Sequence, residues 1–137
     1  MNYPEIDEII TTERALELCK HFELNHLVER ILKNPDQYKE WPFDGVSVLC
    51  ERFAAGVAHV DQEILTNHCA LPHDLEYAYG IPGDKKDKKR VDDEFKQNLL
   101  NKAHMSEFWA SIFHKAVRIG GKEELGLSFT WAFAQKD

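Results

Sequence analysis

The chain has 137 residues, of which 43% are hydrophobic and 30% are charged. This length suits one domain with one core, and the composition is that of a soluble globular protein without an apolar run long enough to span a bilayer. The formal net charge of −7 argues against nucleic-acid binding, because most of the surface would repel a polyphosphate. The one basic cluster, KKDKKR at 85–90, is typical of a solvated surface.

The first residues and the cysteines indicate the cellular compartment in which the protein is expected. The first ten residues, MNYPEIDEII, lack a basic segment followed by an apolar run, so we expect no signal peptide. Three cysteines, at positions 19, 50 and 69, are too few for a disulfide scaffold, although they allow one bridge. A reducing cytoplasm is therefore the expected location.

The apolar spacing of the first 40 residues predicts two helices. Thr11 or Thr12 can cap the first and Asn25 can cap the second, which should end before Pro35. Their inner faces are formed by Ala15, Leu16, Cys19 and Phe22, and by Leu27, Val28, Ile31 and Leu32.

The next segment, YKEWPFDGVS, is predicted to be a loop, because Pro42 and Gly45 interrupt the periodicity. The loop contains one aspartate, Asp44, and Ser47 is placed to cap a helix through VLCERFAAGVAHV. The loop is aromatic-rich, and the sequence contains no linker, internal repeat or low-complexity tract, so we expect a single domain.

Three helices are predicted after residue 70. The first, through PHDLEYAY, should start near Leu71, because Pro72 lacks an N–H, and stop at Gly80. The second, from about 88 to 102, should return antiparallel after the turn GIPGDKK, and Ser106 should cap the third beside it. The apolar faces of the last two helices carry Val91, Phe95 and Leu99, and Trp109, Ile112, Phe113, Ala116 and Val117.

The C-terminal tail has a different pattern. In LGLSFTWAF, apolar residues alternate with small or polar ones, which favours an extended strand or arm over a helix. The alternating residues are Leu125, Leu127, Phe129, Trp131 and Phe133. The prediction is thus a mainly α domain with two long antiparallel helices and a C-terminal extended segment.

The stretch CALPHDLEYAYG contains the candidate chemistry. His73 and Tyr77 are four residues apart and share a helix face, whereas Asp74 is rotated by about 100°. This layout lets an imidazole act as a base on one side while the neighbouring carboxylate holds a metal ion on the other. A catalytic histidine also needs a carboxylate to orient its second nitrogen, and Asp92 lies nearer the apolar face of the next helix than Asp93.

CALPHDLEY, followed by KKRVDDEF and FWASIFHKAVRIGG, resembles the small prokaryotic secreted phospholipase A2 family over residues 41–121. The resemblance implies a phospholipase A2-like helical domain, with 1–40 as an N-terminal helical extension and 122–137 as an extended tail. It implies calcium-dependent hydrolysis of the sn-2 ester of phospholipids, with a phospholipid or membrane surface as partner. An enzyme of this kind without a signal peptide would be exported by a phage particle or a secretion machine.

The resemblance also assigns roles to residues. His73 matches the base that takes a proton from the attacking water, Asp92 the carboxylate that orients it, and Tyr77 the phenol that braces the site. The implied calcium ligands are Asp44, Asp74 and the backbone carbonyl of Gly45. The resemblance leaves open whether Cys50 and Cys69 are bridged.

Other hypotheses use the same residues. An HD-domain phosphohydrolase would hold a metal ion with His59, His73, Asp74 and Asp92 or Asp93, and a zinc site would use His68, Cys69 and His73. Both fit less well, since the HD-domain spacing is wrong and the zinc site lacks a fourth ligand. The third is a non-catalytic module that keeps the phospholipase scaffold and contacts a protein partner through Phe129, Trp131 and Phe133.

Overall fold

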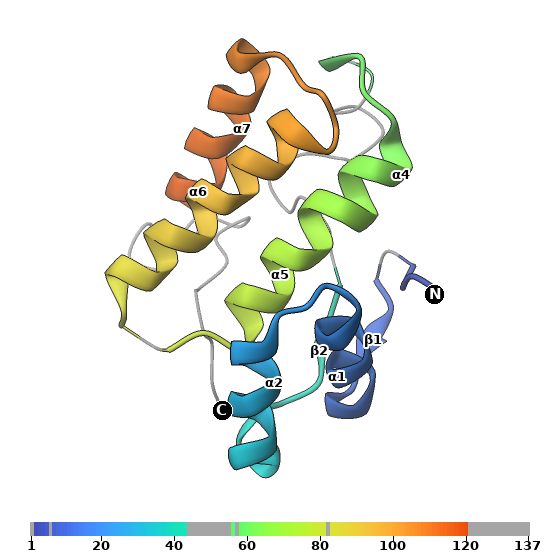
Figure 1. Cartoon of the computed structure of the whole chain (residues 1–137), viewed down its shortest axis with the longest axis vertical. Coiled ribbons are helices and arrows are strands. Elements are labelled where there is room, and N and C mark those ends of the chain that lie inside the picture. Colours follow the sequence, from blue (N-terminus) through green and yellow to red (C-terminus); the bar gives the residue numbers. More distant parts are fainter. Residues whose placement is uncertain (1, 6, 44–55, 57, 82, 121–137) are drawn as a thin grey trace.

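The computed structural model describes residues 2–5, 7–43, 56, 58–81 and 83–120. This part of the chain is mainly helical with a small two-stranded sheet (Figure 1). The elements, in order, are β1 (Ile9–Ile10), α1 (Thr12–His21), α2 (Asn25–Lys33), the 3₁₀ turn η1 (Pro35–Gln37), β2 (Trp41–Pro42), α4 (Gln62–Ile64), the π-helical η2 (Leu65–Ala70), α5 (Leu71–Ala78), α6 (Lys85–Asn101) and α7 (Glu107–Gly120). No helix in these ranges is both long and apolar enough to cross a membrane.

Of the predicted helix caps that the structure describes, two are confirmed and one is wrong. Thr11 Oγ1 accepts a hydrogen bond from the N–H of Arg14, and Ser106 Oγ accepts one from the N–H of Trp109. Asn25 does not cap α2, whose N-cap is Leu24.

The reason is the tight link between α1 and α2. The N–H of Leu24 bonds to the carbonyl of Cys19 and that of Glu23 to Lys20, with Glu23 in the left-handed region at φ 58°. This Schellman arrangement ends α1 and places Leu24 directly at the start of α2. It also places Phe22 and Leu24 in the turn between α1 and α2, which faces α5 and α6.

The segment predicted to be a loop forms a short strand where the structure describes it. Ile9 pairs with Pro42 and Ile10 with Trp41 in an antiparallel register. Bonds between the N–H of Phe43 and the carbonyl of Glu8, and between the N–H of Asp7 and the carbonyl of Phe43, extend this pairing. The predicted positions of Asp44, Gly45, the Ser47-capped helix and the aromatic tail lie outside the described residues.

α5 begins at Leu71, as predicted, but the backbone before it is already helical. This helical backbone starts at Gln62, where Asp61 Oδ1 accepts from the N–H groups of Glu63 and Ile64. The intervening η2 is a wider π-helix, and the N–H of Leu71 bonds to the carbonyl of Thr66, five residues back. Pro72 lacks an N–H and would crowd the preceding turn of an α-helix. The wider π-helical turn lies just before Pro72, and the helix continues past the proline.

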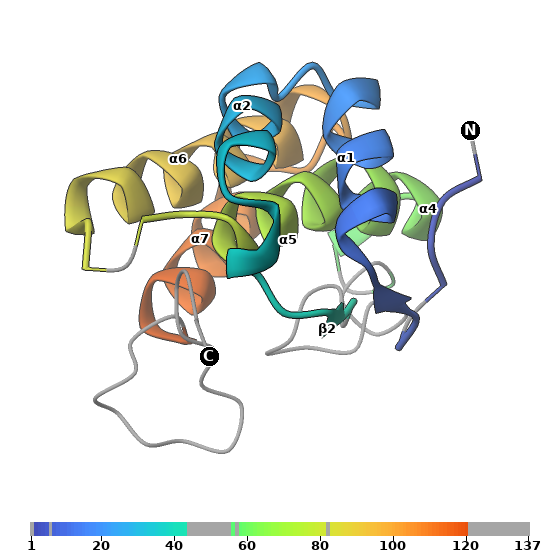
Figure 2. The same ribbon diagram turned by 90° about the horizontal axis from the view of Figure 1, so that it is seen from below.

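The predicted arrangement of the last three helices is confirmed. α5 and α6 run antiparallel, and α7 packs against α6 (Figure 1). Residues of η2, α6 and α7, including Leu65, Phe95, Leu99 and Phe113, form one apolar cluster. A second cluster joins α1, α2 and β2 to α5, and Figure 2 shows α1 and α2 beside α5. α5 is therefore packed from both sides, which holds His73 inside the protein.

Cys19 and Cys69 are buried free thiols, and burial raises the pKa of each to about 12. At pH 8 their thiolate fraction should be roughly 10³-fold below that of an ordinary thiol, before steric shielding is counted. We expect a Cys50→Ser variant to react with Ellman's reagent only as fast as it unfolds. Rapid reaction of two thiols in the folded protein would contradict this burial.

Candidate functional site

His73 on α5 and Asp92 on α6 face each other across the antiparallel pair. His73 Nε2 lies 2.9 Å from Asp92 Oδ1, and both side chains are almost completely buried. This contact confirms the predicted pairing of the two residues. Because α5 and α6 run in opposite directions, residues 19 positions apart in the sequence become direct neighbours.

Tyr77 lies one helical turn after His73 and completes a three-residue cluster. Its hydroxyl donates to the same Oδ1 of Asp92, and its ring centre is 4.3 Å from that of His73. Burial raises the pKa of Tyr77, and the nearby charge of Asp92 raises it further, so the phenol remains a donor. Phe95 contacts the imidazole as well, with its ring centre 4.7 Å away. His73 thus has restricted rotation.

Two cations that the sequence analysis missed bind the other oxygen of Asp92. Lys88 Nζ lies 2.9 Å and Arg118 Nη1 2.8 Å from Oδ2. Lys88 is four residues before Asp92 on α6, a spacing that could have revealed it. Arg118 comes from α7, and no local pattern links it to Asp92.

Asp92 accepts hydrogen bonds from four side chains, His73, Tyr77, Lys88 and Arg118, and these determine its ionisation state. Burial alone would raise the pKa of its carboxyl group, but hydrogen bonds from His73, Tyr77 and Lys88 outweigh burial and lower that pKa. Asp92 is therefore ionised at neutral pH. Since an ionised carboxylate only accepts hydrogen bonds, the proton between it and His73 belongs to Nε2.

Asp74 does not face away from the histidine as the helical rotation predicted. It is buried, and its Oδ1 lies 3.7 Å from Nδ1 of His73. The imidazole therefore has Asp92 at Nε2 and Asp74 near Nδ1. Burial disfavours the charged form of His73, but the two carboxylates outweigh this effect and raise its pKa.

Asp93, the neighbouring aspartate, is a contrasting site. It is partly exposed and pairs with Lys89 and His114, each at 2.8 Å. The prediction that Asp92 is the inner aspartate of the pair is confirmed. The described residues thus include two Lys–Asp–His groups of similar geometry, one buried and one near solvent.

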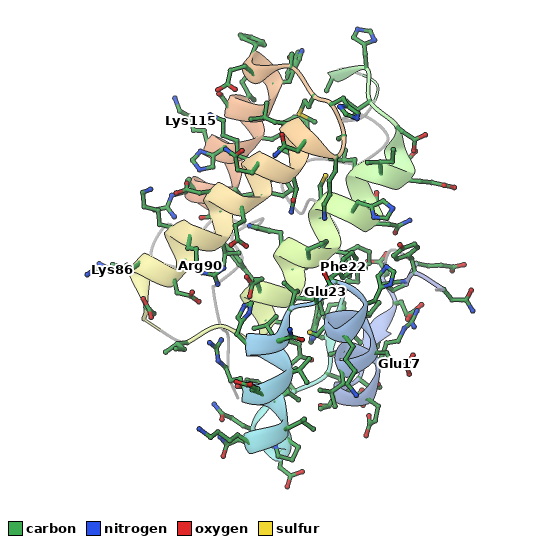
Figure 3. All side chains as sticks on the ribbon, in the orientation of Figure 1. Glu17, Phe22, Glu23, Lys86, Arg90 and Lys115 are labelled. Atoms are coloured by element: carbon green, nitrogen blue, oxygen red, sulfur yellow. The ribbon has the colours of Figure 1, made fainter. Side chains whose placement is uncertain are left out.

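A second buried carboxylate lies on α5, one turn from His73. Glu76 is 2.5 Å from Nε2 of His26 on α2 and 2.9 Å from Nη1 of Arg90 on α6. Figure 3 labels Arg90 on the part of α6 that lies beside α5. The sequence analysis missed this contact, because His26 and Glu76 are 50 residues apart. It ties the N-terminal helices to the helix that carries His73.

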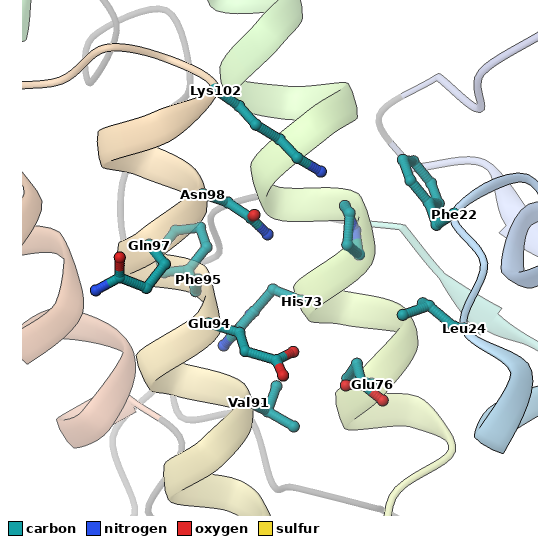
Figure 4. Close-up of a pocket in the computed structure, with 11 residues that line it drawn as sticks. Phe22, Leu24, His73, Glu76, Val91, Glu94, Phe95, Gln97, Asn98 and Lys102 are labelled. Atoms are coloured by element: carbon teal, nitrogen blue, oxygen red, sulfur yellow. The ribbon is translucent and has the colours of Figure 1, made fainter.

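A cavity of about 210 Å³ lies between the turn from α1 to α2 and the helices α5 and α6 (Figure 4). Its walls combine an apolar side with a polar edge, and His73 borders it. The lining residues are Phe22, Leu24, Pro72, Val91 and Phe95 on the apolar side, and Glu76, Glu94, Gln97, Asn98 and Lys102 at the polar edge. The cavity offers apolar surface next to the imidazole.

The predicted metal sites differ in how far the structure describes them. The described residues contain no group of three or more His, Cys, Asp or Glu side chains arranged to hold a metal ion. The HD-domain set of His59, His73, Asp74 and Asp92 or Asp93 and the zinc set of His68, Cys69 and His73 fall within the described ranges, so neither is assembled. Of the implied calcium ligands, Asp74 is described and supplies the hard carboxylate oxygen that calcium prefers.

No family model, no curated protein and no solved structure matches this chain. The functional assignment therefore rests on the residues and their geometry.

Proposed function

We propose that this chain is a calcium-dependent hydrolase of the sn-2 ester of phospholipids, built on a phospholipase A2-like domain. The observation that carries the proposal is the buried cluster of His73, Asp92 and Tyr77, in which one carboxylate oxygen accepts from both the imidazole and the phenol. A histidine held by an ionised carboxylate on one nitrogen is the arrangement that a general base requires.

The roles of the side chains follow from their atoms. Asp92 keeps the proton on Nε2, so Nδ1 is the nitrogen that accepts a proton from water as the water oxygen attacks the ester carbonyl. The ester C–O bond then breaks, and His73 returns the proton to the departing alkoxide of the lysophospholipid. Asp92 stabilises the imidazolium that forms between these steps.

Asp74, with Asp44 and the carbonyl of Gly45, would hold calcium in this site. Asp74 suits this role because it is a carboxylate 3.7 Å from Nδ1 of His73. Bound calcium supplies positive charge that binds the phosphate and polarises the ester carbonyl. The apolar walls of the 210 Å³ cavity offer a place for an acyl chain next to His73.

The Asp74→Asn variant tests the proposed calcium site. We expect its calcium affinity, measured by titration calorimetry, to fall roughly tenfold, because the ion loses a charged ligand. Asp93→Asn is the control, since Asp93 is an aspartate of the same chain that pairs with Lys89 and His114 instead. Equal affinity in both variants would contradict a role of Asp74 as a ligand.

A surface on α7 supports contact with a lipid interface. Phe108 and Ile112 are four residues apart, share a helix face and are 66% and 39% exposed. Lys115 projects outward from the same helix (Figure 3). Exposed apolar side chains next to a cation suit the boundary between lipid tails and anionic head groups.

Phe108→Glu is expected to lower fatty-acid release from phospholipid vesicles roughly tenfold, because it places a charge where an apolar ring would enter the interface. Release from a short-chain phospholipid below its micellar concentration should not change. Leu32→Glu is the matched control, since Leu32 on α2 is 61% exposed. A similar loss in both variants would argue against a lipid-facing role for α7.

A different product would redirect the proposal. Phosphate release from nucleotides with manganese would favour the HD-domain class. If neither reaction occurs in the folded protein, the non-catalytic interaction module with its aromatic tail is the remaining hypothesis.

A further inference from the structure

Asp92 is held at both oxygens, and the two oxygens have different partners. Oδ1 accepts from His73 and Tyr77, whereas Oδ2 accepts from Lys88 and Arg118. The two cations come from different helices, α6 and α7. Lys88 Nζ also lies 3.5 Å from the backbone carbonyl of Arg118, which joins Lys88 to α7 as well.

This arrangement is more than a means of holding α6 to α7. Those helices already share a buried apolar cluster that includes Phe95, Leu99 and Phe113. Replacing a buried ionic group by apolar residues often leaves stability unchanged or raises it, so packing alone does not call for two cations here. A carboxylate bonded only at Oδ1 could rotate about its Cβ–Cγ bond, and donors on both oxygens remove that freedom.

We propose that Lys88 and Arg118 are positioning residues: they clamp Oδ2 of Asp92 and so hold Oδ1 at the place where it orients His73. Neither residue touches the substrate. The effect of the clamp on turnover rests on the proposed function, but its effect on the His73–Asp92 hydrogen bond does not.

The exposed Asp93 group provides the matched control. Lys89 lies 2.8 Å from Asp93 and Lys88 lies 2.9 Å from Asp92, and both pairs have i, i+4 spacing on α6. The side chain of Lys88 is 12% exposed and that of Lys89 is 65% exposed. Only the buried pair should influence the histidine.

The first readout is the proton on Nε2 of His73, observed by NMR at pH 7 and assigned by its absence in His73→Gln. In the unmodified protein we expect a downfield signal that exchanges slowly with water, because the hydrogen bond is buried and charge-assisted. Arg118→Gln and Lys88→Gln should broaden this signal or remove it, and Arg118→Lys should partly preserve it. Lys89→Gln should leave it unchanged.

The second readout is kinetic. Arg118→Gln should lower kcat for sn-2 ester hydrolysis roughly tenfold with little change in KM, because a misplaced base affects the transition state more than substrate binding. Each variant is first checked for a cooperative unfolding transition. Should Arg118→Gln fail to fold, Arg118→Lys replaces it. Lysine keeps the positive charge but is shorter than arginine, so we expect a weaker Nε2 proton signal and an intermediate kcat.

The outcomes separate the two proposals. An unchanged Nε2 proton in folded Arg118→Gln and Lys88→Gln would overturn the clamp, whatever the protein hydrolyses. Loss of that signal without any fatty-acid release by the unmodified protein would support the clamp and reject the phospholipase. A loss of signal in Lys89→Gln as well would also overturn the clamp, because the effect would then not depend on Oδ2.

Discussion

His73→Ala is expected to lower kcat for calcium-dependent release of sn-2 fatty acid by about 10³-fold, with KM nearly unchanged. The variant removes the base that takes the proton from water, and no other described residue replaces it beside Asp92. The measurement is the initial rate of fatty-acid release at saturating calcium. The folded state should persist, and its thermal unfolding is measured alongside.

His114→Ala provides the matched control for this loss. His114 also bonds an aspartate of α6, with Nε2 2.8 Å from Asp93 Oδ1, but that pair lies near solvent. We expect its kcat to stay within about twofold of the unmodified protein, since a partly exposed pair away from the reacting groups contributes little. Activity in His73→Ala close to that of His114→Ala would remove His73 from the mechanism.

Asp92→Asn is expected to have the largest effect on folding. Removing this carboxylate charge leaves Lys88 and Arg118 without their buried counter-charge, which should lower the free energy of unfolding by about 3–5 kcal/mol. Asp93→Asn should change it by less than about 1 kcal/mol, because its pairs are partly exposed. Urea unfolding at pH 7 measures both values.

The ionisation of Asp92 should also make the stability of the fold depend on pH. The pKa of Asp92 is lowered in the folded protein, so its contribution is present above its ordinary value of 3.8 and is lost as the pH falls toward the lower folded value. The difference in unfolding free energy between the unmodified protein and Asp92→Asn should therefore shrink in acid below about pH 4. A difference that stays constant down to pH 2 would show that the charge of Asp92 does not stabilise the fold.

Much of the central cluster could be predicted from local rules. The i, i+4 spacing places His73 and Tyr77 on one face, and the short turn between two apolar helices brings Asp92 to that face. Asp92 could be distinguished from Asp93 by its position relative to Val91 and Phe95. These contacts depend on two neighbouring helices and one connection, which sequence periodicity describes well.

Other parts of the site depend on distant segments. Arg118 reaches Asp92 from a third helix, and His26 reaches Glu76 across 50 residues, so no spacing rule indicates either contact. Asp74 was expected to face another neighbour, yet packing on both sides of α5 buries it. The π-helical turn before Pro72 was also missed, because proline is normally a signal that a helix starts or ends.

The central claim is that the His73–Asp92 pair hydrolyses one particular ester. The most direct measurement incubates the unmodified protein with a phosphatidylcholine that carries different fatty acids at its two positions, with millimolar calcium or with a chelator. The account predicts release of the sn-2 fatty acid alone, and only with calcium. Release of neither fatty acid by the folded protein, or equal release with the chelator, would contradict it.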